Sequence, residues 1–372
     1  MKYFYTLLII LLIVSCNNDV ILNPSENFSN VDIIDIYADE EDLITLLSNR
    51  MYNTEISVIL FYKGEKYNAL LRSSGAGSRY HSKWSYRVIL NGNKFIEGIR
   101  EFNLSAQIFD KTFLSTTIAT KIYRDNGFIL FDSKHVFLRI NDEEKGLYLL
   151  IEKIDEDFFS RRNKKVNELF KLNFNADFTF NNPNYPELTF DKEIPNDENF
   201  NSISDFIYAV DTSQNDRIYS SLGKFLDIDN YLNYHAITTI INNSDAFRNN
   251  FYFLKQEPQS PFIIMPWDFD KVFEEASAIN SIYGYNALIV KLLSEESTRN
   301  KYLDIFEEKL NILDMNYLNN VIDSTSNKIR EAYNADPYLG KGRYNFDAEI
   351  NSLKNFINNR KVLLKSLLDE YR

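Results

Sequence analysis

The residues best suited to chemistry lie between positions 243 and 270. Asp245 and Asn250 stand five residues apart, the spacing that phosphoryl-transfer enzymes use between a catalytic carboxylate and a metal-binding amide. An apolar run at 262–265 then leads into Pro-Trp-Asp-Phe-Asp, so that Asp268 and Asp270 follow at its exposed end. Residue types and spacing together predict a site for phosphoryl transfer.

Phosphoryl transfer accounts for each of these residue types. The transferring group is already highly charged, so the protein contributes position and positive charge, usually as Mg²⁺. Mg²⁺ prefers oxygen ligands, so carboxylates and an Asn carbonyl are suitable, and a separate Asp must lie near the acceptor hydroxyl to orient it and take its proton. Two like charges about 4 Å apart repel by roughly 4 kcal/mol at an effective dielectric near 20, and a bound dication would remove that repulsion.

Each carboxylate taken alone has a simpler interpretation. Asp is common in loops, where its side chain bonds the local backbone. The combination is harder to explain in this way, because an apolar strand ends in two acids and a second strand leads back to an Asp with an Asn companion. We therefore interpret the group as a functional site.

Two parts of the chain with different residue patterns must position these candidate site residues. The first, from 31 to about 159, contains strand-like runs separated by turns and is interrupted by one helix at about 111–123. Its clearest strand-like runs are 55–62, 84–90, 135–140 and 147–151. This pattern predicts a small, mostly β unit.

Helical spacing dominates the second part, from about 202 onward. Apolar residues from Phe225 to Thr239 predict a helix that leads into the Asp245 loop, and 248–268 predict a hairpin. A last helix is expected over 346–368 with Asp347 as its cap. Between the two parts, 163–200 is Asn-rich and irregular, which fits an insertion, a lid or a long connection.

Several segments resemble the CotH (spore coat protein H) family of atypical, secreted protein kinases. The family's hallmark is an Asp, an Asn-Asn-Tyr-type hairpin and a Pro-Trp-Asp-x-Asp strand end, which here read Asp245, Asn249-Asn250-Phe251-Tyr252 and Pro266-Trp267-Asp268-Phe269-Asp270. The other matching segments are Leu71-Arg72 through Gly75, Lys83 to Arg87, Gly146 to Leu149, Glu152 to Asp155, and a closing helix with Phe346, Ile350, Leu353, Phe356, Ile357 and Arg360. The resemblance covers residues 31–372.

The resemblance implies an α+β, atypical protein-kinase-like two-lobed fold. Its small, β-rich N-lobe would span 31–160, and its mostly helical C-lobe would span 161–372 with the catalytic and metal-binding loops. The sequence departs from an ordinary kinase in three respects. Residues 75–78 hold only a fragment of a Gly-x-Gly-x-x-Gly loop, Asp245 is not part of a His-Arg-Asp triplet, and Asp268 is followed by Phe269-Asp270 instead of Phe-Gly.

The resemblance also assigns roles to individual residues. Asp245 would be the catalytic acid and Asp268 the chief ligand of Mg²⁺ or Mn²⁺, joined by Asn250 and Asp270.

For ATP, Lys83 would contact the phosphates, Arg72 would help to cradle them, and the backbone near Glu152 would meet the adenine. A solvated strand lysine is an equally good interpretation of Lys83. No acid can be assigned as its partner, since the helix expected at 111–123 contains none.

The beginning of the chain predicts a location. A basic start, an apolar run at 7–14 and Ser15-Cys16 are typical of a lipoprotein signal peptide over 1–15, followed by a lipidated Cys16 and a polar tether over 16–30. Acyl chains on Cys16 would anchor the protein to a membrane. We expect an extracytoplasmic position in a bacterial cell envelope, on the periplasmic side or at the cell surface.

Composition excludes several function classes. The net charge of −12, with 41 basic and 53 acidic residues, disfavours nucleic-acid binding. A single Cys allows no intramolecular disulfide, and the isolated His81, His135 and His235 lack the spacing of a helical zinc site. No Gly-x-Ser-x-Gly motif supports a serine hydrolase.

The functional interpretation that follows is a membrane-anchored protein kinase. It would transfer the γ-phosphate of ATP to Ser or Thr of an unknown exported protein and would depend on a divalent metal. The alternative is a surface or periplasmic binding or assembly lipoprotein, adhesin-like, on a kinase-like scaffold with little or no catalysis. A third and weaker option is a hydrolase that uses Asp268 and Asp270 as paired acids without nucleotide.

Overall fold

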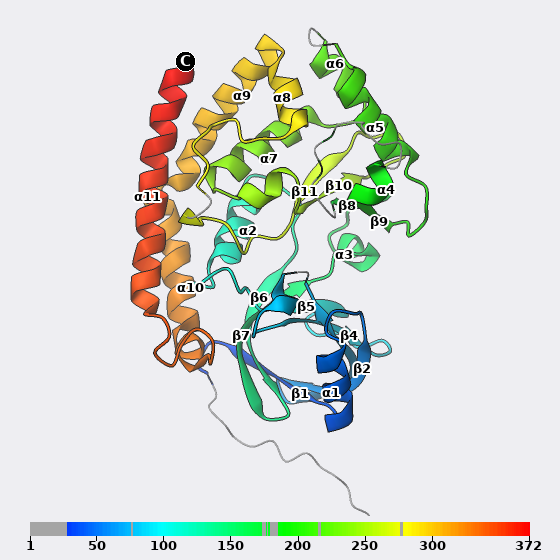
Figure 1. The fold of residues 1–372 in the computed structure, drawn as a ribbon, viewed down its shortest axis with the longest axis vertical. Helices are drawn as coiled ribbons and strands as arrows, with labels where there is room; N and C mark the ends of the chain where they lie inside the picture. Colours follow the sequence, from blue (N-terminus) through cyan, green and yellow to red (C-terminus); the bar gives the residue numbers. More distant parts are fainter. Residues whose placement is uncertain are drawn as a thin grey trace, which may run out of the picture.

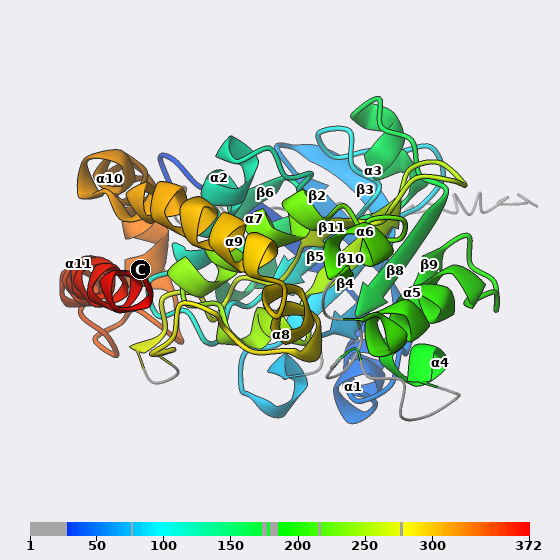
Figure 2. The same cartoon turned by 90° about the horizontal axis from the view of Figure 1, so that it is seen from above.

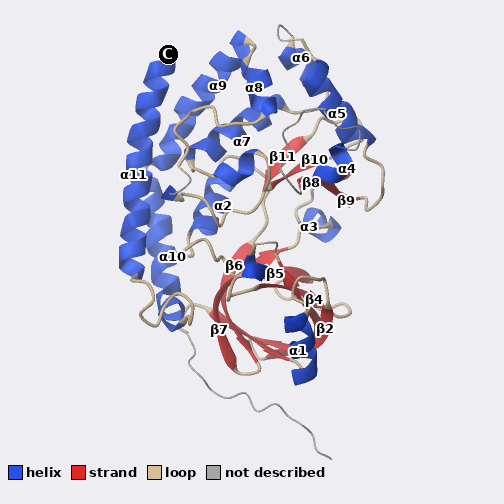
Figure 3. Cartoon of the chain, in the orientation of Figure 1, coloured by secondary structure: helices blue, strands red, loops and turns tan. Residues whose placement is uncertain are grey.

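The fold is α+β, with a closed barrel at one end and a second sheet covered by helices at the other (Figures 1 and 3). The computed structural model describes residues 28–75, 77–172, 176, 178, 185–214, 217–275 and 278–372. The predicted signal peptide, Cys16 and most of the predicted tether lie outside these residues. Within them, no helix has the length and apolar character needed to cross a bilayer.

Seven strands close the barrel in the order β1-β2-β3-β4-β5-β7-β6. The strands are β1 (Asp32–Tyr37), β2 (Glu55–Tyr62), β3 (Glu65–Ser74), β4 (Ser85–Leu90), β5 (Glu101–Ser105), β6 (Ser133–Ile140) and β7 (Glu143–Glu152). Neighbours are antiparallel except for β1 and β6, whose parallel pairing closes the ring. Helix α1 (Glu40–Ser48) lies against the barrel and buries Leu46 in its core.

Alternation along the strands explains why the barrel closes. In β2, Ile56, Val58, Leu60 and Tyr62 are buried and point inward, while the residues between them face outward. Because β4 and β5 alternate in the same way, the barrel has an apolar interior and a partly polar outer face.

The second sheet has four strands in the order β11-β10-β8-β9. They are β8 (Glu168–Leu172), β9 (Phe190–Ile194), β10 (Phe251–Lys255) and β11 (Ile263–Pro266). The predicted hairpin at 248–268 is present as β10 and β11. The expectation of an irregular 163–200 segment was wrong, because β8, the short helix α4 (Tyr185–Thr189) and β9 come from it. Phe170 and Phe190 are buried in the core beneath this sheet.

Helices cover the second sheet and extend away from the barrel. They are α3 (Glu156–Arg161), α5 (Asn201–Thr212), α6 (Ile218–Leu222), α7 (Ile228–Ile240), α8 (Ala287–Leu293), α9 (Glu296–Lys309), α10 (Met315–Ala335) and α11 (Phe346–Tyr371). Figure 2 shows α10 and α11 along one flank, with α4, α5 and β9 on the opposite flank. The first turn of α11 is capped by Asn345, which accepts a hydrogen bond from the Ala348 amide, and not by Asp347 as expected.

One helix crosses the division expected from the sequence. Helix α2 (Ser115–Asp125) lies between β5 and β6 in the chain, yet its apolar face packs into the larger core with the helices and the second sheet. Tyr123 of α2 stacks on Phe269 with ring centroids 5.5 Å apart, and its hydroxyl bonds to Thr238 of α7 at 2.7 Å. Helix α2 therefore fastens the barrel to the segment that carries the candidate acids.

A buried ion pair provides a second attachment. Lys83, just before β4, donates to Asp336 at the end of α10 at 2.7 Å, and the same Asp336 oxygen accepts from the Leu147 amide of β7. Gly146 is required beside this pair, because its φ is +93° and a Cβ there would lie 2.2 Å from the Asp336 carboxylate. The pair joins the barrel to the base of α10.

Candidate active site

A pocket of about 350 Å³ lies between the outer face of the barrel and the second sheet. Its barrel wall comes from the ends of β3, β4, β5 and β7, and its opposite wall comes from β8, β9, β10 and the segment after β11. The lining residues are Ser74, Gly75, Ser85, Arg87, Asn103, Ser105, Gln107, Thr116, Phe131, Ile151, Lys153, Ile154, Lys171, Leu172, Glu193, Asn250, Tyr252, Trp267, Asp268 and Phe269. We refer to it as the central pocket.

The β10–β11 register brings two of the predicted site residues to the central pocket. Phe251 pairs with Pro266, and the Trp267 amide donates to the carbonyl of Asn250 at 3.0 Å. Asn250 and Asp268 therefore lie at the same end of the hairpin. Both have left-handed backbones, with φ of +60° and +56°, a conformation that Asn and Asp tolerate better than most residues.

Asp245 lies on a 3₁₀ turn, Ser244–Phe247, between α7 and β10. Its carboxylate accepts hydrogen bonds from the amide groups of Asn249 at 3.0 Å and Asn250 at 3.2 Å, and from the Lys271 ammonium at 3.2 Å. Because Asn250 uses its amide nitrogen for Asp245, its amide oxygen is available as a ligand for a cation.

Phe269 holds the two acids that flank it. Its ring is buried and stacks on Tyr123 and on Phe131, with centroids 5.5 Å and 5.9 Å apart. The carboxyl groups of Asp268 and Asp270 lie close enough together to affect each other's titration. The Phe between the acids is therefore a packing anchor that fixes where they lie.

The acids raise one another's pKa values. The surrounding protein removes bulk water from Asp268, Asp245 adds a negative charge, and together they raise the Asp268 pKa above its usual value. Solvent still reaches this side chain in the pocket, so the like charges matter more for its titration than the desolvation does. Burial, followed by the charge of Asp268, raises the pKa of Asp270 well above its usual value.

This donor set fits a magnesium-type ion. Among the described residues, no three His, Cys, Asp or Glu side chains form a ready-made metal site. Mg²⁺ usually takes only one or two protein carboxylates and completes its shell with substrate phosphates and water. Asp268, Asp270 and the Asn250 amide oxygen match that requirement, and a cation would relieve the repulsion that raises the acids' pKa values.

Lys83, which was expected to contact ATP phosphates, does not line the central pocket. Its side chain is only 5% exposed, and its ammonium donates to Asp336 and to the Leu147 carbonyl at 2.6 Å. The rings of Phe113 and Tyr148 lie 4.9 Å from the ammonium. Asp336 is thus the partner that the sequence could not assign.

Arg72 and Glu152 are not among the residues that line the central pocket either, although Arg72 pairs with Arg87 across β3 and β4. Arg72 donates to Asn53 at 2.8 Å, and burial, followed by the neighbouring charge of Arg87, lowers its pKa. The buried Glu152 carboxylate pairs with Arg161 and Arg162. The ATP-binding role of these side chains stays a prediction, although the residues on either side of Glu152, Ile151 and Lys153, do line the pocket.

The sequence reasoning missed three cations that do line the central pocket. Arg87 of β4 bonds Asn103 of β5 at 3.2 Å, Lys153 pairs with Glu101 at 3.1 Å, and Lys171 of β8 faces them. The alternation of apolar and polar residues in 85–90 and 101–105 could have predicted the position of Arg87. It places Arg87 and Asn103 on the face opposite the apolar residues of the barrel core.

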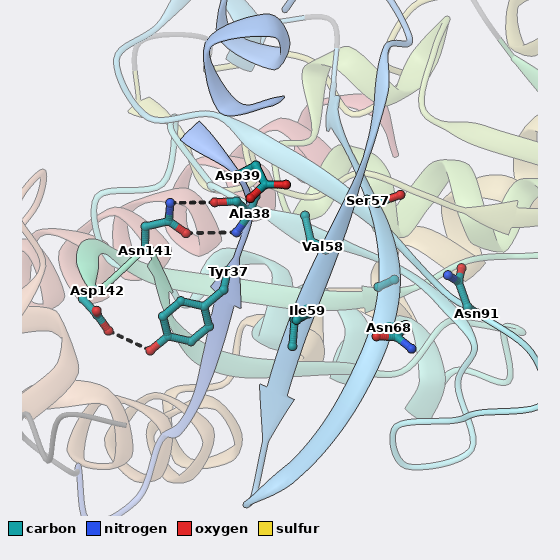
Figure 4. A pocket seen from close by; sticks show the side chains of 11 residues that line it. Tyr37, Ala38, Asp39, Ser57, Val58, Ile59, Asn68, Asn91, Asn141 and Asp142 are labelled. Atoms are coloured by element: carbon teal, nitrogen blue, oxygen red, sulfur yellow. Dashed lines mark hydrogen bonds between the residues drawn. The ribbon is translucent and has the colours of Figure 1, made fainter. Parts of the chain in front are cut away.

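A larger hollow, of about 680 Å³, lies on the barrel near the start of α1 (Figure 4). Its lining residues are Tyr37, Ala38, Asp39, Ser57, Val58, Ile59, Asn68, Ala69, Asn91, Asn141 and Asp142. No Lys or Arg is among them. A triphosphate needs cations, so the smaller central pocket is the better candidate for a nucleotide despite its size.

Comparison with known proteins identifies the class to which this fold and site belong. A family model described as CotH kinase protein matches residues 71–364, which is most of the chain. The chain belongs to this family, and the resemblance of its motifs is confirmed. It is similar to inner spore coat protein H of Bacillus subtilis (strain 168), with 23% identity over 358 residues, covering 92% of this chain and 99% of that protein.

Two solved structures are more distantly similar. The proinflammatory kinase CtkA of Helicobacter pylori aligns with a TM-score of 0.35 and 13% identity, covering 84% of this chain and 89% of that chain. The toxin–antitoxin complex of HipA, HipB and operator DNA from Shewanella oneidensis MR-1 aligns with a TM-score of 0.39 and 11% identity, covering 95% and 75%. Both scores are low, so the functional argument rests on the family and on the site.

Proposed function

We propose that this protein is an atypical protein kinase that transfers the γ-phosphate of ATP to a Ser or Thr hydroxyl of an exported protein. In this proposal the barrel acts as the small lobe and the rest of the chain as the large lobe of a kinase-like fold. The observation that carries it is the convergence of Asp245, Asn250, Asp268 and Asp270 beside a pocket whose facing wall holds Arg87 and Lys153.

Each side chain would have a defined task. Asp245 would orient the acceptor hydroxyl and take its proton as the oxygen attacks phosphorus. Asp268, Asn250 and Asp270 would hold Mg²⁺ or Mn²⁺, which supplies neutralising charge at the phosphates when bound.

The cations and apolar residues of the central pocket would hold the nucleotide. Arg87, Lys153 and Lys171 would donate to the phosphate oxygens. Ile151, near the end of β7, and Ile154, two residues after that strand, would pack against the base. The backbone of this stretch would provide the donors and acceptors for the adenine edge.

The remaining parts of the proposal concern place and partners. The pattern of residues 1–16 supports a lipid anchor on Cys16 and an extracytoplasmic position in the cell envelope. The partners would then be ATP, an exported protein substrate and the membrane, with no nucleic acid, as the net charge of −12 favours.

The proposal is tested by transfer of labelled γ-phosphate from ATP, with Mg²⁺ or Mn²⁺, to a generic protein acceptor or to the protein itself. The full chain is compared with the variants Asp245→Asn and Asp268→Asn. The matched control is Asp369→Asn, which changes an exposed residue of α11. We expect label to be lost in both site variants and kept in the control. Absence of both transfer and metal-dependent ATP binding would instead favour a binding or assembly lipoprotein, and nucleotide-independent hydrolysis would favour the hydrolase.

A further inference from the structure

Lys271 is a cation at the candidate site that belongs to none of the family-like segments described above. It follows the second acid of the Asp268-Phe269-Asp270 segment, and its ammonium lies 3.2 Å from an oxygen of Asp245. Both side chains of this pair are about one-third exposed, at 35% and 34%. An exposed ion pair contributes only about 0–1 kcal/mol to folding. Stability therefore explains little of why a lysine should lie there.

Lys271 lies where the Asp245 turn, Phe109 and the loop before β4 come together. Besides Asp245, its ammonium lies 5.0 Å from the centre of the Phe109 ring. Phe109 is 39% exposed, and its ring lies 5.6 Å from that of His81 in the loop that precedes β4. A Cβ on Gly77 of the same loop would touch Phe109 at 3.6 Å. An exposed aromatic ring that carries a lysine beside a carboxylate is an arrangement for holding a cation in place.

The position of the acceptor follows from Asp245. A hydroxyl that gives its proton to Asp245 must lie within hydrogen-bond distance of that carboxylate. The phosphorus that the hydroxyl oxygen attacks must then lie about 3–3.5 Å from the oxygen. An ammonium already bonded to the same carboxylate is within reach of the phosphoryl oxygens. Because a lysine has three donors, Lys271 can keep its bond to Asp245 and give another to phosphate.

We propose that Lys271 is a catalytic residue that bridges Asp245 and the transferring phosphoryl group. In the step, the acceptor oxygen forms a bond to phosphorus, and its proton goes to Asp245. The bond between phosphorus and the bridging oxygen breaks, and its electron pair stays on ADP. Lys271 keeps its protons throughout and stabilises the charge on the phosphoryl oxygens. This inference rests on the proposed kinase activity.

A contact to the phosphoryl group in transfer affects kcat more than ATP binding. Removing one such donor from a transition-state site typically lowers kcat about 10²- to 10³-fold. We therefore expect Lys271→Met to lower kcat by about 100-fold and to change the ATP KM by less than about 3-fold, since the lost contact acts mainly in the transition state. Lys271→Arg keeps the charge and should retain much of the activity. Phe109→Leu, which removes the ring beneath the ammonium, should lower kcat less than Lys271→Met does.

The experiment measures the steady-state kinetics of phosphate transfer from ATP by the full chain and by these variants. Lys365→Met, at an exposed position of α11, is the matched control. Thermal unfolding of each variant shows whether it is folded, and Lys271→Arg and Phe109→Leu keep the test decisive if Lys271→Met is not. Wild-type transfer with unchanged kcat in Lys271→Met would overturn the role of Lys271 and leave the kinase proposal standing. Equal losses in Lys271→Met and Lys271→Arg, or a loss confined to KM, would also overturn it. No transfer by the wild type would overturn both proposals.

Discussion

Arg87 and Lys83 lie four residues apart, but their charges have different surroundings. Arg87 is 23% exposed and lines the central pocket, whereas Lys83 is buried against Asp336. A hydrogen bond to a charged group contributes about 1.5–3 kcal/mol, so we expect Arg87→Met to raise the KM for ATP at least about 10-fold. Arg87→Lys should have a smaller effect because it keeps a charge. Steady-state transfer over a range of ATP concentrations measures both.

Lys83→Met is the informative comparison for Arg87→Met. Breaking a buried ion pair costs about 3–5 kcal/mol, although Asp336 would keep its bonds to the amides of Leu147, Tyr338 and Leu339. The lysine variant should therefore show a lower midpoint in urea, with little change in the KM of the molecules that remain folded. A stable Lys83→Met protein with a raised KM would show that the two cations have been assigned the wrong way round.

Sequence reasoning predicted that the acids lie together but did not predict where this lysine lies. The spacing of Asp245, Asn250 and Asp268 reflects a local hairpin, so the structure brings them together as the pattern indicates. Lys83 depends on Asp336, which is 253 residues away in the chain. No local pattern carries information about such a partner. Lys171 could not be placed either, because the sequence around it did not predict the strand β8 that carries it.

At the scale of elements, α11 supports the end of α7 from which the catalytic turn begins. Arg360 of α11 is 2% exposed and donates to the carbonyls of Thr239 and Ile240 at the end of α7 and to that of Ile279. The Ile240 carbonyl is one that a helix end would otherwise leave without a partner, whereas the Thr239 carbonyl also accepts from the Asn242 amide at 3.2 Å. Burial lowers the pKa of Arg360 to about 10, which leaves its charge intact at neutral pH. Asp245 follows only five residues after Ile240.

Replacing Arg360 should therefore affect both stability and the site. Each buried carbonyl left without a partner costs about 1–3 kcal/mol, so Arg360→Met, which removes the partner of the Ile240 and Ile279 carbonyls, should destabilise the protein by about 2 kcal/mol or more. Amide hydrogen exchange should also become faster at the end of α7 and in the Asp245 turn. Urea unfolding and exchange measure the two effects, with Lys365→Met on the same helix as control. Normal protection of the Asp245 turn in Arg360→Met would contradict this coupling.

The elements that sequence predicted well are those with strong periodicity. The run 55–62 alternates cleanly and became β2, and the apolar spacing after 346 became α11. The strands β8 and β9 were missed because each has only five residues and they flank an Asn-rich stretch. Their apolar residues are buried by tertiary packing on β10 and α5, which a local window does not contain.

At the scale of the whole molecule, two histidines are buried as neutral groups against the larger of the two cores. His135 of β6 bonds the Phe113 carbonyl at 2.9 Å, and His235 of α7 bonds the Tyr283 carbonyl at 2.7 Å. Burial lowers the pKa of each to about 4, from a usual value of about 6.5. Both were expected to be isolated core or surface residues with no metal, and the structure places both in the interior.

The sign of their effect on stability follows from proton binding. Between pH 6.5 and 4 the unfolded chain protonates these histidines and the folded chain does not, so their contribution to stability falls as the pH falls. The contribution is fully present above pH 6.5 and levels off below pH 4. Near pH 5 the slope should approach about 1 kcal/mol per pH unit for each histidine. The raised pKa values of Asp268 and Asp270 act in the opposite direction, because the folded state binds their protons first.

A difference between variants separates these opposing effects. The free energy of unfolding is measured in urea from pH 7 to pH 4.5 for the wild type and for His135→Gln and His235→Gln, with the exposed His81→Gln as control. Each buried variant should lose stability overall but show a shallower decline with acidification than the wild type, while the control keeps the wild-type slope. If all four proteins declined in parallel, the buried histidines would already be charged in the folded state, and some group facing them would have to supply the compensating negative charge.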